Sequence, residues 1–265
     1  MEKNIKNTQK KDRKVGQIMG INVTGTSTKQ VLARVEGFIT DSVKFYIVTP
    51  NPEIILMAQR DEKLKNAMNG TELAIPDGIG LKFAIPDLPI IKGRELFIKL
   101  IKLAAKKNWK VFLLGGLGNE AELTAKKLSC KAGSGSARQI QYDKFIQLDK
   151  DGQPATEVDR KLQFDTITKI NKFKPQLLFV AFGNPKQEIW VHENYSKLSI
   201  GGAMAVGGAF RYVAGLSKLP PKWMASAGLE WLYRLFTEPC RIGRVFNAVL
   251  VFPLRVLIYK TKHPV

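Results

Sequence analysis

The stretch Phe45-Tyr-Ile-Val-Thr-Pro-Asn-Pro52 decides the fold of this chain. Its first four residues are aromatic or β-branched, which favours a buried β-strand. The pair Asn51-Pro52 then favours a helix start, because asparagine is a good N-cap and proline fits the first helical position. A strand that runs directly into a helix is the building unit of α/β folds.

The same alternation of apolar runs and helical patterns continues on both sides of this stretch. We predict strands over residues 45–48, 71–75, 110–114, 176–182 and 203–206. We predict helices over residues 53–66, just after 78, and over 95–107, 119–128, 164–173 and 185–198. Residues 131–160 are polar and predict irregular structure. Together these patterns predict an α/β fold, with a Rossmann-like, mostly parallel sheet flanked by helices.

The C-terminal residues have a different pattern, because no strand signal appears after about Gly215. Arg234, Arg241 and Arg244 are spaced to share one face of a helix, and apolar side chains fill much of the rest. We expect a helical appendage that lies on an anionic membrane, although a core-packing helix with a basic edge, or arginines folded over a diphosphate, fits the same pattern. The apolar run at 245–259 contains polar residues and a proline, which argues against a membrane-spanning helix.

Composition agrees with a globular protein that meets anions. The chain has 265 residues, of which 45% are hydrophobic, and this excludes a disordered protein. Its net charge of +19 predicts a polyanionic partner: nucleic acid, an anionic membrane or a phosphorylated substrate. The predicted domains are a basic flexible arm (1–14), the α/β core (15–215) and the appendage (216–265). The polar N-terminus lacks a signal-peptide core, so we expect a cytoplasmic protein.

Several candidate site residues follow predicted strands, which is where parallel sheets hold their ligands. They are Thr49, Asn51, Asp77, Gly115, Gly116, Gly183, Asn184 and, in the next helix, Gln187. Asp77 fits two roles that do not exclude each other, an N-cap and a general base. Asn184 and Gln187 have the spacing of a capping box, and exposed amides there could also hold a nucleotide or sugar.

Two other motifs argue against cofactors. Gly115-Gly-Leu-Gly118 could approach a phosphate, but it is not a dinucleotide fingerprint because Glu120 occupies the sixth position. This disfavours a nicotinamide-dependent oxidoreductase. Asp149-Lys-Asp151 is similar to the DxD of metal-dependent glycosyltransferases, but it lies in a polar stretch far from any strand end, so we interpret it as a surface turn. The sequence therefore predicts no metal and no cofactor.

An ordered set of motifs resembles the WecG/TagA/CpsF glycosyltransferases, glycosyltransferase family 26, over about residues 16–250. The motifs are Thr49-Pro-Asn-Pro52, Pro76-Asp-Gly-Ile-Gly80, Gly93-Arg-Glu95, Phe112-Leu-Leu-Gly-Gly116, Gly183-Asn-Pro-Lys-Gln-Glu188, Val206-Gly-Gly-Ala-Phe210, Gly228-Leu-Glu-Trp-Leu-Tyr-Arg-Leu235 and Glu238-Pro239 with Arg241. The resemblance implies an inverting, metal-independent enzyme on the inner face of the membrane. It would move a sugar from a UDP donor to GlcNAc on undecaprenyl diphosphate, in the synthesis of teichoic acid or another surface polysaccharide.

The resemblance also implies roles for single residues. Asp77 would be the base, and Thr49, Asn51, Arg94 and Gln187 would bind substrate. Arg234, Arg241 and Arg244 would close over the site at the membrane. Self-association also occurs in the family.

Two departures leave the donor open. Arg211 stands where the family commonly has aspartate, and Leu219-Pro-Pro221 replaces an Arg-Ala-Pro. UDP-ManNAc is the preferred donor, with UDP-glucose and UDP-ManNAcA as alternatives. A nucleic-acid-binding protein is a remote alternative, because no recognised nucleic-acid motif accompanies the charge.

Overall fold

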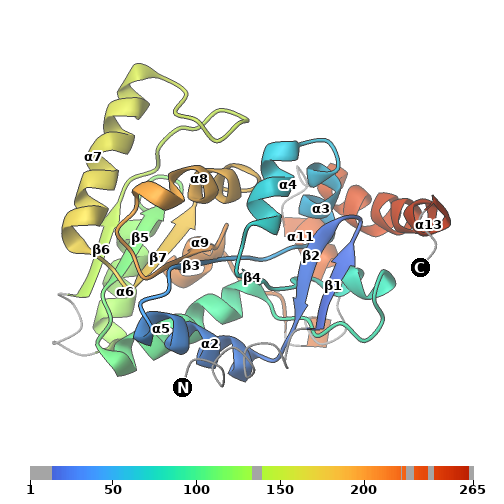
Figure 1. Ribbon diagram of the computed structural model, residues 1–265, viewed down its shortest axis with the longest axis horizontal. Coiled ribbons are helices and arrows are strands. Elements are labelled where there is room, and N and C mark those ends of the chain that lie inside the picture. Colours follow the sequence, from blue (N-terminus) through green and yellow to red (C-terminus); the bar gives the residue numbers. More distant parts are fainter. Residues whose placement is uncertain (1–13, 133–138, 222, 225–229, 238–241, 263–265) are drawn as a thin grey trace.

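The computed structural model describes residues 14–132, 139–221, 223–224, 230–237 and 242–262. In this part of the chain a six-stranded parallel sheet forms the centre (Figure 1). Its strands are β3 (Phe45–Val48), β4 (Leu73–Ala74), β5 (Val111–Gly115), β6 (Ile140–Asp143), β7 (Leu177–Ala181) and β8 (Gly202–Ala205). They pair in the order β4-β3-β8-β7-β5-β6, each pair parallel. The predicted α/β fold is therefore confirmed.

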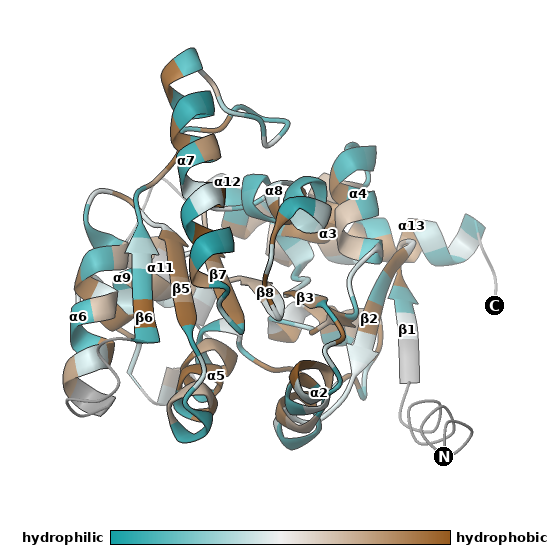
Figure 2. Cartoon of the chain, turned by 60° about the vertical axis from the view of Figure 1, so that its left-hand side comes forward, coloured by the Kyte–Doolittle hydropathy of each residue, from teal (hydrophilic) through white to brown (hydrophobic). Residues whose placement is uncertain are grey.

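Helices cover both faces of this sheet (Figures 1 and 2). They are α2 (Thr28–Thr40), α5 (Gly93–Lys107), α6 (Glu120–Ala132) and α9 (Ala209–Ala214) on one face, and α7 (Glu157–Phe173) and α8 (Lys186–Asn194) on the other. Alternate strand residues point to opposite faces, so Phe45 and Ile47 join one core and Tyr46 and Val48 the other. The central strands are accordingly hydrophobic on both faces, as parallel sheets require.

A third hydrophobic cluster lies beyond the β4 edge of the sheet. The sequence patterns predicted its helical part but not its β-hairpin. The antiparallel hairpin of β1 (Lys14–Ile18) and β2 (Ile21–Gly25) packs there against helices α3 (Pro52–Ala58) and α4 (Glu62–Asn69). The predicted helix over 53–66 is thus two helices, because Asp61 accepts a hydrogen bond from the Leu64 N–H (3.0 Å) and caps a new one. Lys14 belongs to β1, and the rest of the predicted arm lies outside the described residues.

Two other predictions of local structure need correction. Residues 131–160 are not irregular throughout, because β6 and the start of α7 lie in this range. The helix predicted over 185–198 is shorter: α8 ends at Asn194, and the 3-10 turn η3 (Tyr195–Lys197) follows. The predicted surface turn is present, since the Asp149 side chain accepts hydrogen bonds from the N–H groups of Asp151 and Gln153 (2.8 and 2.9 Å).

The described C-terminal residues are helical, as predicted. They form α11 (Glu230–Thr237), α12 (Ile242–Phe246), a π-helical turn η5 (Asn247–Val251) and α13 (Phe252–Lys262). Ile242–Lys262 is one continuous run, whose most apolar 18-residue window has a mean hydropathy of 1.6 and is 11% buried. By length and composition alone this run could cross a membrane. Pro253 does not interrupt this run, which continues from the π-helical turn into α13.

Candidate active site

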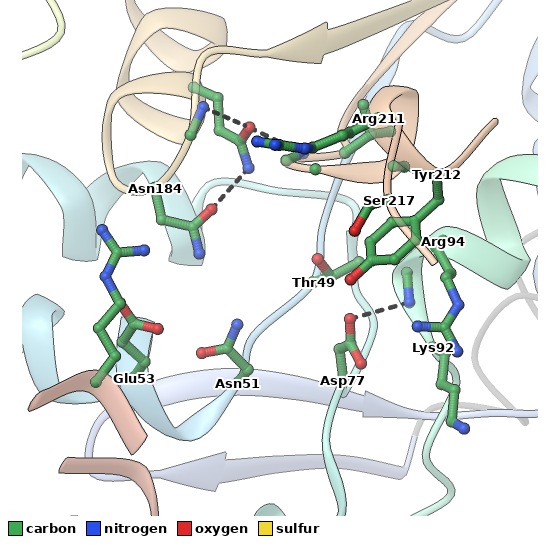
Figure 3. A pocket seen from close by; sticks show the side chains of 18 residues that line it. Thr49, Asn51, Glu53, Asp77, Lys92, Arg94, Asn184, Arg211, Tyr212 and Ser217 are labelled. Carbon is green, nitrogen blue, oxygen red and sulfur yellow. Dashed lines mark hydrogen bonds and ion pairs between the residues drawn. The ribbon is translucent and has the colours of Figure 1, made fainter. Parts of the chain in front are cut away.

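A cavity of about 220 Å³ opens at the carboxyl ends of four strands, β4, β3, β8 and β7, which are neighbours in the sheet. Its wall contains Thr49, Asn51, Glu53, Asp77, Lys92, Gly93, Arg94, Gly183, Asn184, Gln187, Val206, Gly207, Gly208, Ala209, Arg211, Tyr212, Ser217 and Arg244. Eight of the predicted site residues, from Thr49 to Arg244, therefore meet in one place (Figure 3). Parallel strands produce this convergence, since their loops all leave the sheet at one edge.

Asp77 is fixed at the start of helix α5. Its backbone N–H donates to the Pro50 carbonyl (2.7 Å), which ties the loop after β4 to the loop after β3. One oxygen of its carboxylate, Oδ2, accepts the backbone N–H of Gly93 (3.0 Å; dashed in Figure 3). Asp77 thus holds the N-terminal end of a helix, but of α5 and not of the 3-10 helix η1 (Ile79–Phe83) that follows it directly. Both sequence-based roles remain compatible, since the carboxylate also faces the cavity.

Gly93 leaves room for this contact. A Cβ atom at Gly93 would stand 3.0 Å from Asp77 Oδ2 and 3.2 Å from the Thr49 Cγ2 methyl. Only a glycine therefore lets the start of α5 approach both side chains so closely. The strand ends of β3 and β4 and the start of α5 form one tightly packed corner around the carboxylate.

Asn51 is the predicted N-cap of α3. Its Oδ1 accepts the Ile54 N–H (3.0 Å), and Pro52 is the first helical residue. The second residue of α3, Glu53, pairs with Arg244 from the C-terminal helices (Nε to Oε1, 3.4 Å). This ion pair brings one of the predicted C-terminal arginines into the wall of the cavity.

Asn184 does not cap α8, contrary to the capping-box prediction. Helix α8 begins at Lys186 without a side-chain cap. The Asn184 Oδ1 accepts instead from Gln187 Nε2 (2.8 Å), while Gln187 Oε1 accepts the N–H groups of Gly183 (3.2 Å) and Gly207 (3.0 Å). The Gln187 amide therefore ties the loop after β7 to the loop after β8, in a fixed orientation because its oxygen has two backbone donors.

Glu188 is a buried carboxyl group directly behind this amide. Its Oε1 accepts from Gln187 Nε2 (2.8 Å), and its Oε2 has no hydrogen-bond partner. Burial raises the pKa of Glu188 to about 7, and the hydrogen bond from Gln187 offsets part of that rise. The motif contained this residue, but nothing in the sequence indicated that it would be buried.

The cavity carries a surplus of positive charge. Four cationic side chains line it, Lys92, Arg94, Arg211 and Arg244, against the carboxylates of Glu53 and Asp77. The Arg94 guanidinium also lies 5.5 Å from the centre of the Tyr212 ring, which holds it at one side of the opening. Planar guanidinium groups bind phosphate oxygens in pairs, so this wall suits a diphosphate.

The other four predicted site residues are not among the described residues that line the polar cavity. Gly115 and Gly116 end β5 and pack against Ala181 and Glu120, so their role in binding stays a prediction. The side chain of Arg234 and all of Arg241 lie outside the described residues. The sequence motifs did not indicate Lys92, Tyr212 or Ser217, and the position of Lys92 just before Gly93-Arg94 was the one signal for any of them.

Comparison with known proteins gives a family. A model of the Glycosyl transferase WecG/TagA/CpsF family matches residues 16–264. The chain is also similar to proteins of Staphylococcus aureus strains NCTC 8325 / PS 47 and COL, each named N-acetylglucosaminyldiphosphoundecaprenol N-acetyl-beta-D-mannosaminyltransferase. It is 29% identical to each of them over 255 residues, which cover 92% of this chain and 93% of the relative.

Proposed function

The chain belongs to the WecG/TagA/CpsF family of glycosyl transferases, and from this premise we propose that it transfers N-acetylmannosamine from UDP to GlcNAc on undecaprenyl diphosphate. The names of the Staphylococcus aureus relatives support the acceptor and the transferred sugar. UDP-glucose and UDP-ManNAcA remain the alternative donors. The product would serve teichoic acid or another cell-wall polysaccharide.

One observation carries the proposal: a carboxylate, Asp77, faces a cavity that is otherwise rich in positive charge. A transferase of this type needs a base to take the proton of the acceptor hydroxyl, and it needs cations to meet the charge that grows on the leaving UDP. Asp77 Oδ2 accepts the Gly93 N–H (3.0 Å), and the Asp77 carboxylate has the chemistry of the base.

The reaction that we propose is a single displacement without a metal ion. Asp77 accepts the proton of a GlcNAc hydroxyl, which O4 fits best, while that oxygen attacks the anomeric carbon of the donor sugar. The bond to UDP breaks and the configuration inverts. Lys92, Arg94, Arg211 and Arg244 then balance the negative charge on UDP in place of a metal. Thr49, Asn51 and Gln187 would position the substrates, together with Gly183 and Asn184.

The same proposal places the protein at a membrane. The acceptor lipid must stay in the bilayer, and the apolar run Ile242–Lys262 with the net positive charge of the chain favours contact with an anionic surface. We propose the cytoplasmic face, where UDP-sugars are made, with residues 216–265 as the membrane-facing part and residues 15–215 as the catalytic core. Arg234 and Arg241 would join Arg244 over the site. Copies of the chain could associate with one another, and nucleic acid would not be a partner.

The test is UDP release from UDP-N-acetylmannosamine with a lipid-diphosphate-GlcNAc acceptor, with and without EDTA. Asp77→Asn should lower turnover about 10²- to 10⁴-fold, because the amide cannot accept the proton. The matched control is Asp87→Asn, which makes the same change at an exposed carboxylate outside the cavity and should keep wild-type turnover. Full turnover by Asp77→Asn would contradict the base assignment, and loss of turnover in EDTA would contradict the metal-independent reaction.

A further inference from the structure

A second cavity, of about 700 Å³, also borders Asp77. Asp77 and Lys92 belong to the walls of both cavities. We call this second cavity the apolar groove, because most of its wall is hydrophobic: Ile79, Phe83, Ile91, Trp231, Val249 and Pro253. The polar cavity and the apolar groove thus meet at the one carboxylate that the proposed reaction needs.

The groove is formed by two parts of the chain that lie far apart in sequence. Ile79 and Phe83 come from the 3-10 helix after Asp77, whereas Trp231 and Val249 come from the C-terminal helices α11 and η5. All four side chains are more than a third exposed to solvent. Large apolar side chains that face one another across an open groove indicate a site for an apolar ligand.

The charges of the groove restrict what this ligand is. Its charged residues are the cations Lys82 and Lys92 and the carboxylates of Asp77 and Glu95, and Lys92 and Asp77 stand where the groove meets the polar cavity. A ligand that fits has an apolar chain for the groove and an anionic group for the end near Asp77. A polyprenyl diphosphate has this order of groups, with the sugar attached beyond the diphosphate.

We infer that the apolar groove binds the first isoprene units of the acceptor lipid, an inference that rests on the proposed function. The diphosphate then lies near Lys82 and Lys92, and the sugar reaches Asp77 from the groove side. The donor occupies the polar cavity, which shares Asp77 with the groove. This arrangement gives one base access to the acceptor hydroxyl beside the donor sugar without overlap of the two substrates.

The surroundings of the groove agree with a lipid that enters from a bilayer. Its C-terminal wall continues into α13, where the exposed apolar residues Leu254 and Leu257 follow Pro253. A helix with this exposed apolar surface can rest on a membrane, so the lipid would pass from the bilayer directly between η1 and the C-terminal helices. Lipid binding in the groove and membrane contact through the exposed face of α13 are therefore two different roles, and separate substitutions can test each.

The experiment compares two soluble acceptors, GlcNAc diphosphate esterified with a methyl group and with a geranyl group, both below any micelle-forming concentration and without membrane. The wild-type kcat/KM for the geranyl acceptor should exceed that for the methyl acceptor by about tenfold or more, because isoprene carbons leave water for the groove. In Ile79→Ser and Val249→Ser this preference should fall to about twofold or less. Val249→Trp, which fills the groove, should remove the preference as well.

Leu254→Ser is the matched control, because Leu254 is an exposed apolar residue (58%) of α13 outside the groove. It should keep the geranyl preference and weaken only sedimentation with anionic vesicles. Equal kcat/KM for both acceptors in the wild type, or loss of the preference in Leu254→Ser, would overturn the groove assignment. Absence of turnover with either acceptor and every UDP-sugar would instead overturn the proposed function, so the two failures are distinguishable.

Discussion

The polar cavity and the apolar groove share Asp77 but are built in different ways. The polar cavity is made mostly by the loops that leave the parallel sheet and by the helices that follow them, and Arg244 is its one described contribution from the C-terminal helices. The apolar groove combines residues of the sheet domain, such as Ile79, with four residues of the C-terminal helices, such as Val249. The base is therefore fixed by the core alone. The proposed lipid site exists only when the C-terminal helices are docked against the core.

Phe252 tests the second half of this comparison and should give the largest effect. Its side chain is fully buried at the start of α13, in the cluster that also holds the β1–β2 hairpin and Ile54 of α3. Phe252→Ala should lower the free energy of unfolding by about 3–5 kcal/mol, because a large apolar side chain leaves a cavity in a packed core. Urea unfolding followed by circular dichroism measures the change.

The neighbouring exposed face of α13 supplies the control for Phe252. Leu254→Ala should change stability by no more than about 0.5 kcal/mol, since Leu254 contributes little to the core. Equal, small effects of both substitutions would mean that the C-terminal helices are a detachable appendage, as the pattern of the sequence alone allowed. Unequal effects would make α13 part of the folded core as well as a candidate membrane surface.

The sequence predicted the polar cavity well for a physical reason. Parallel strands bring their C-terminal loops to one edge, so Thr49, Asp77 and Gly183 had to converge once the strands were recognised. Asn51 capped its helix as expected, because the cap depends only on residues within one turn. The similar pair Asn184-Pro185 did not, because Gln187 is within reach of the Asn184 side chain and also of two loops that no local pattern reveals.

The apolar groove and the hairpin could not be predicted in the same way. The two walls of the groove are about 150 residues apart in sequence, so only the folded chain brings them together. The β1–β2 hairpin turns at Met19-Gly20, both with positive φ (50° and 77°). Two-residue turns of this kind usually carry Asn-Gly or Asp-Gly, and methionine in the first position conceals the signal.

Gly93 tests the first half of the comparison, that the core alone positions the base. In Gly93→Ala the new methyl group would press on Asp77 Oδ2 and on Thr49, so one or both must move by a few tenths of an ångström. Turnover should fall about 10- to 100-fold, because small displacements of a catalytic group are costly, while the geranyl preference should survive. Steady-state kinetics with both soluble acceptors measures the two quantities together.

Gly37→Ala is the matched control for the Gly93 substitution. Gly37 also lies in a helix, α2, but a Cβ atom there would meet no atom within 4 Å. This variant should keep wild-type turnover and gain up to about 1 kcal/mol of stability from the better helix propensity of alanine. If Gly37→Ala and Gly93→Ala behaved alike, the close contact at Asp77 would have no catalytic consequence.

Behind the polar cavity lies the buried carboxyl group of Glu188, and the pH dependence of stability tests whether it is protonated. Burial raises the pKa of Glu188 to about 7, whereas the unfolded chain has the ordinary value of 4.5. Between these pH values the folded protein keeps a proton that the unfolded chain has released. The free energy of unfolding should therefore fall as the pH rises from about 4.5 to 7, by on the order of 3 kcal/mol, and level off above pH 7.

Glu188→Gln should remove this part of the pH dependence, because an amide carries no titrating proton, and its oxygen can still accept from Gln187. The new NH₂ group replaces an oxygen without a partner, so the variant can be less stable at every pH, and the measurement that decides is the slope. Urea unfolding at pH 5, 6, 7 and 8 gives it. Glu157→Gln, at an exposed carboxylate of α7 (85% exposed), should keep the wild-type slope. If the free energy of unfolding of Glu188→Gln had the same pH slope as the wild type, the Glu188 carboxyl group would be ionised in the folded protein. The polar region would then extend behind the wall of the cavity.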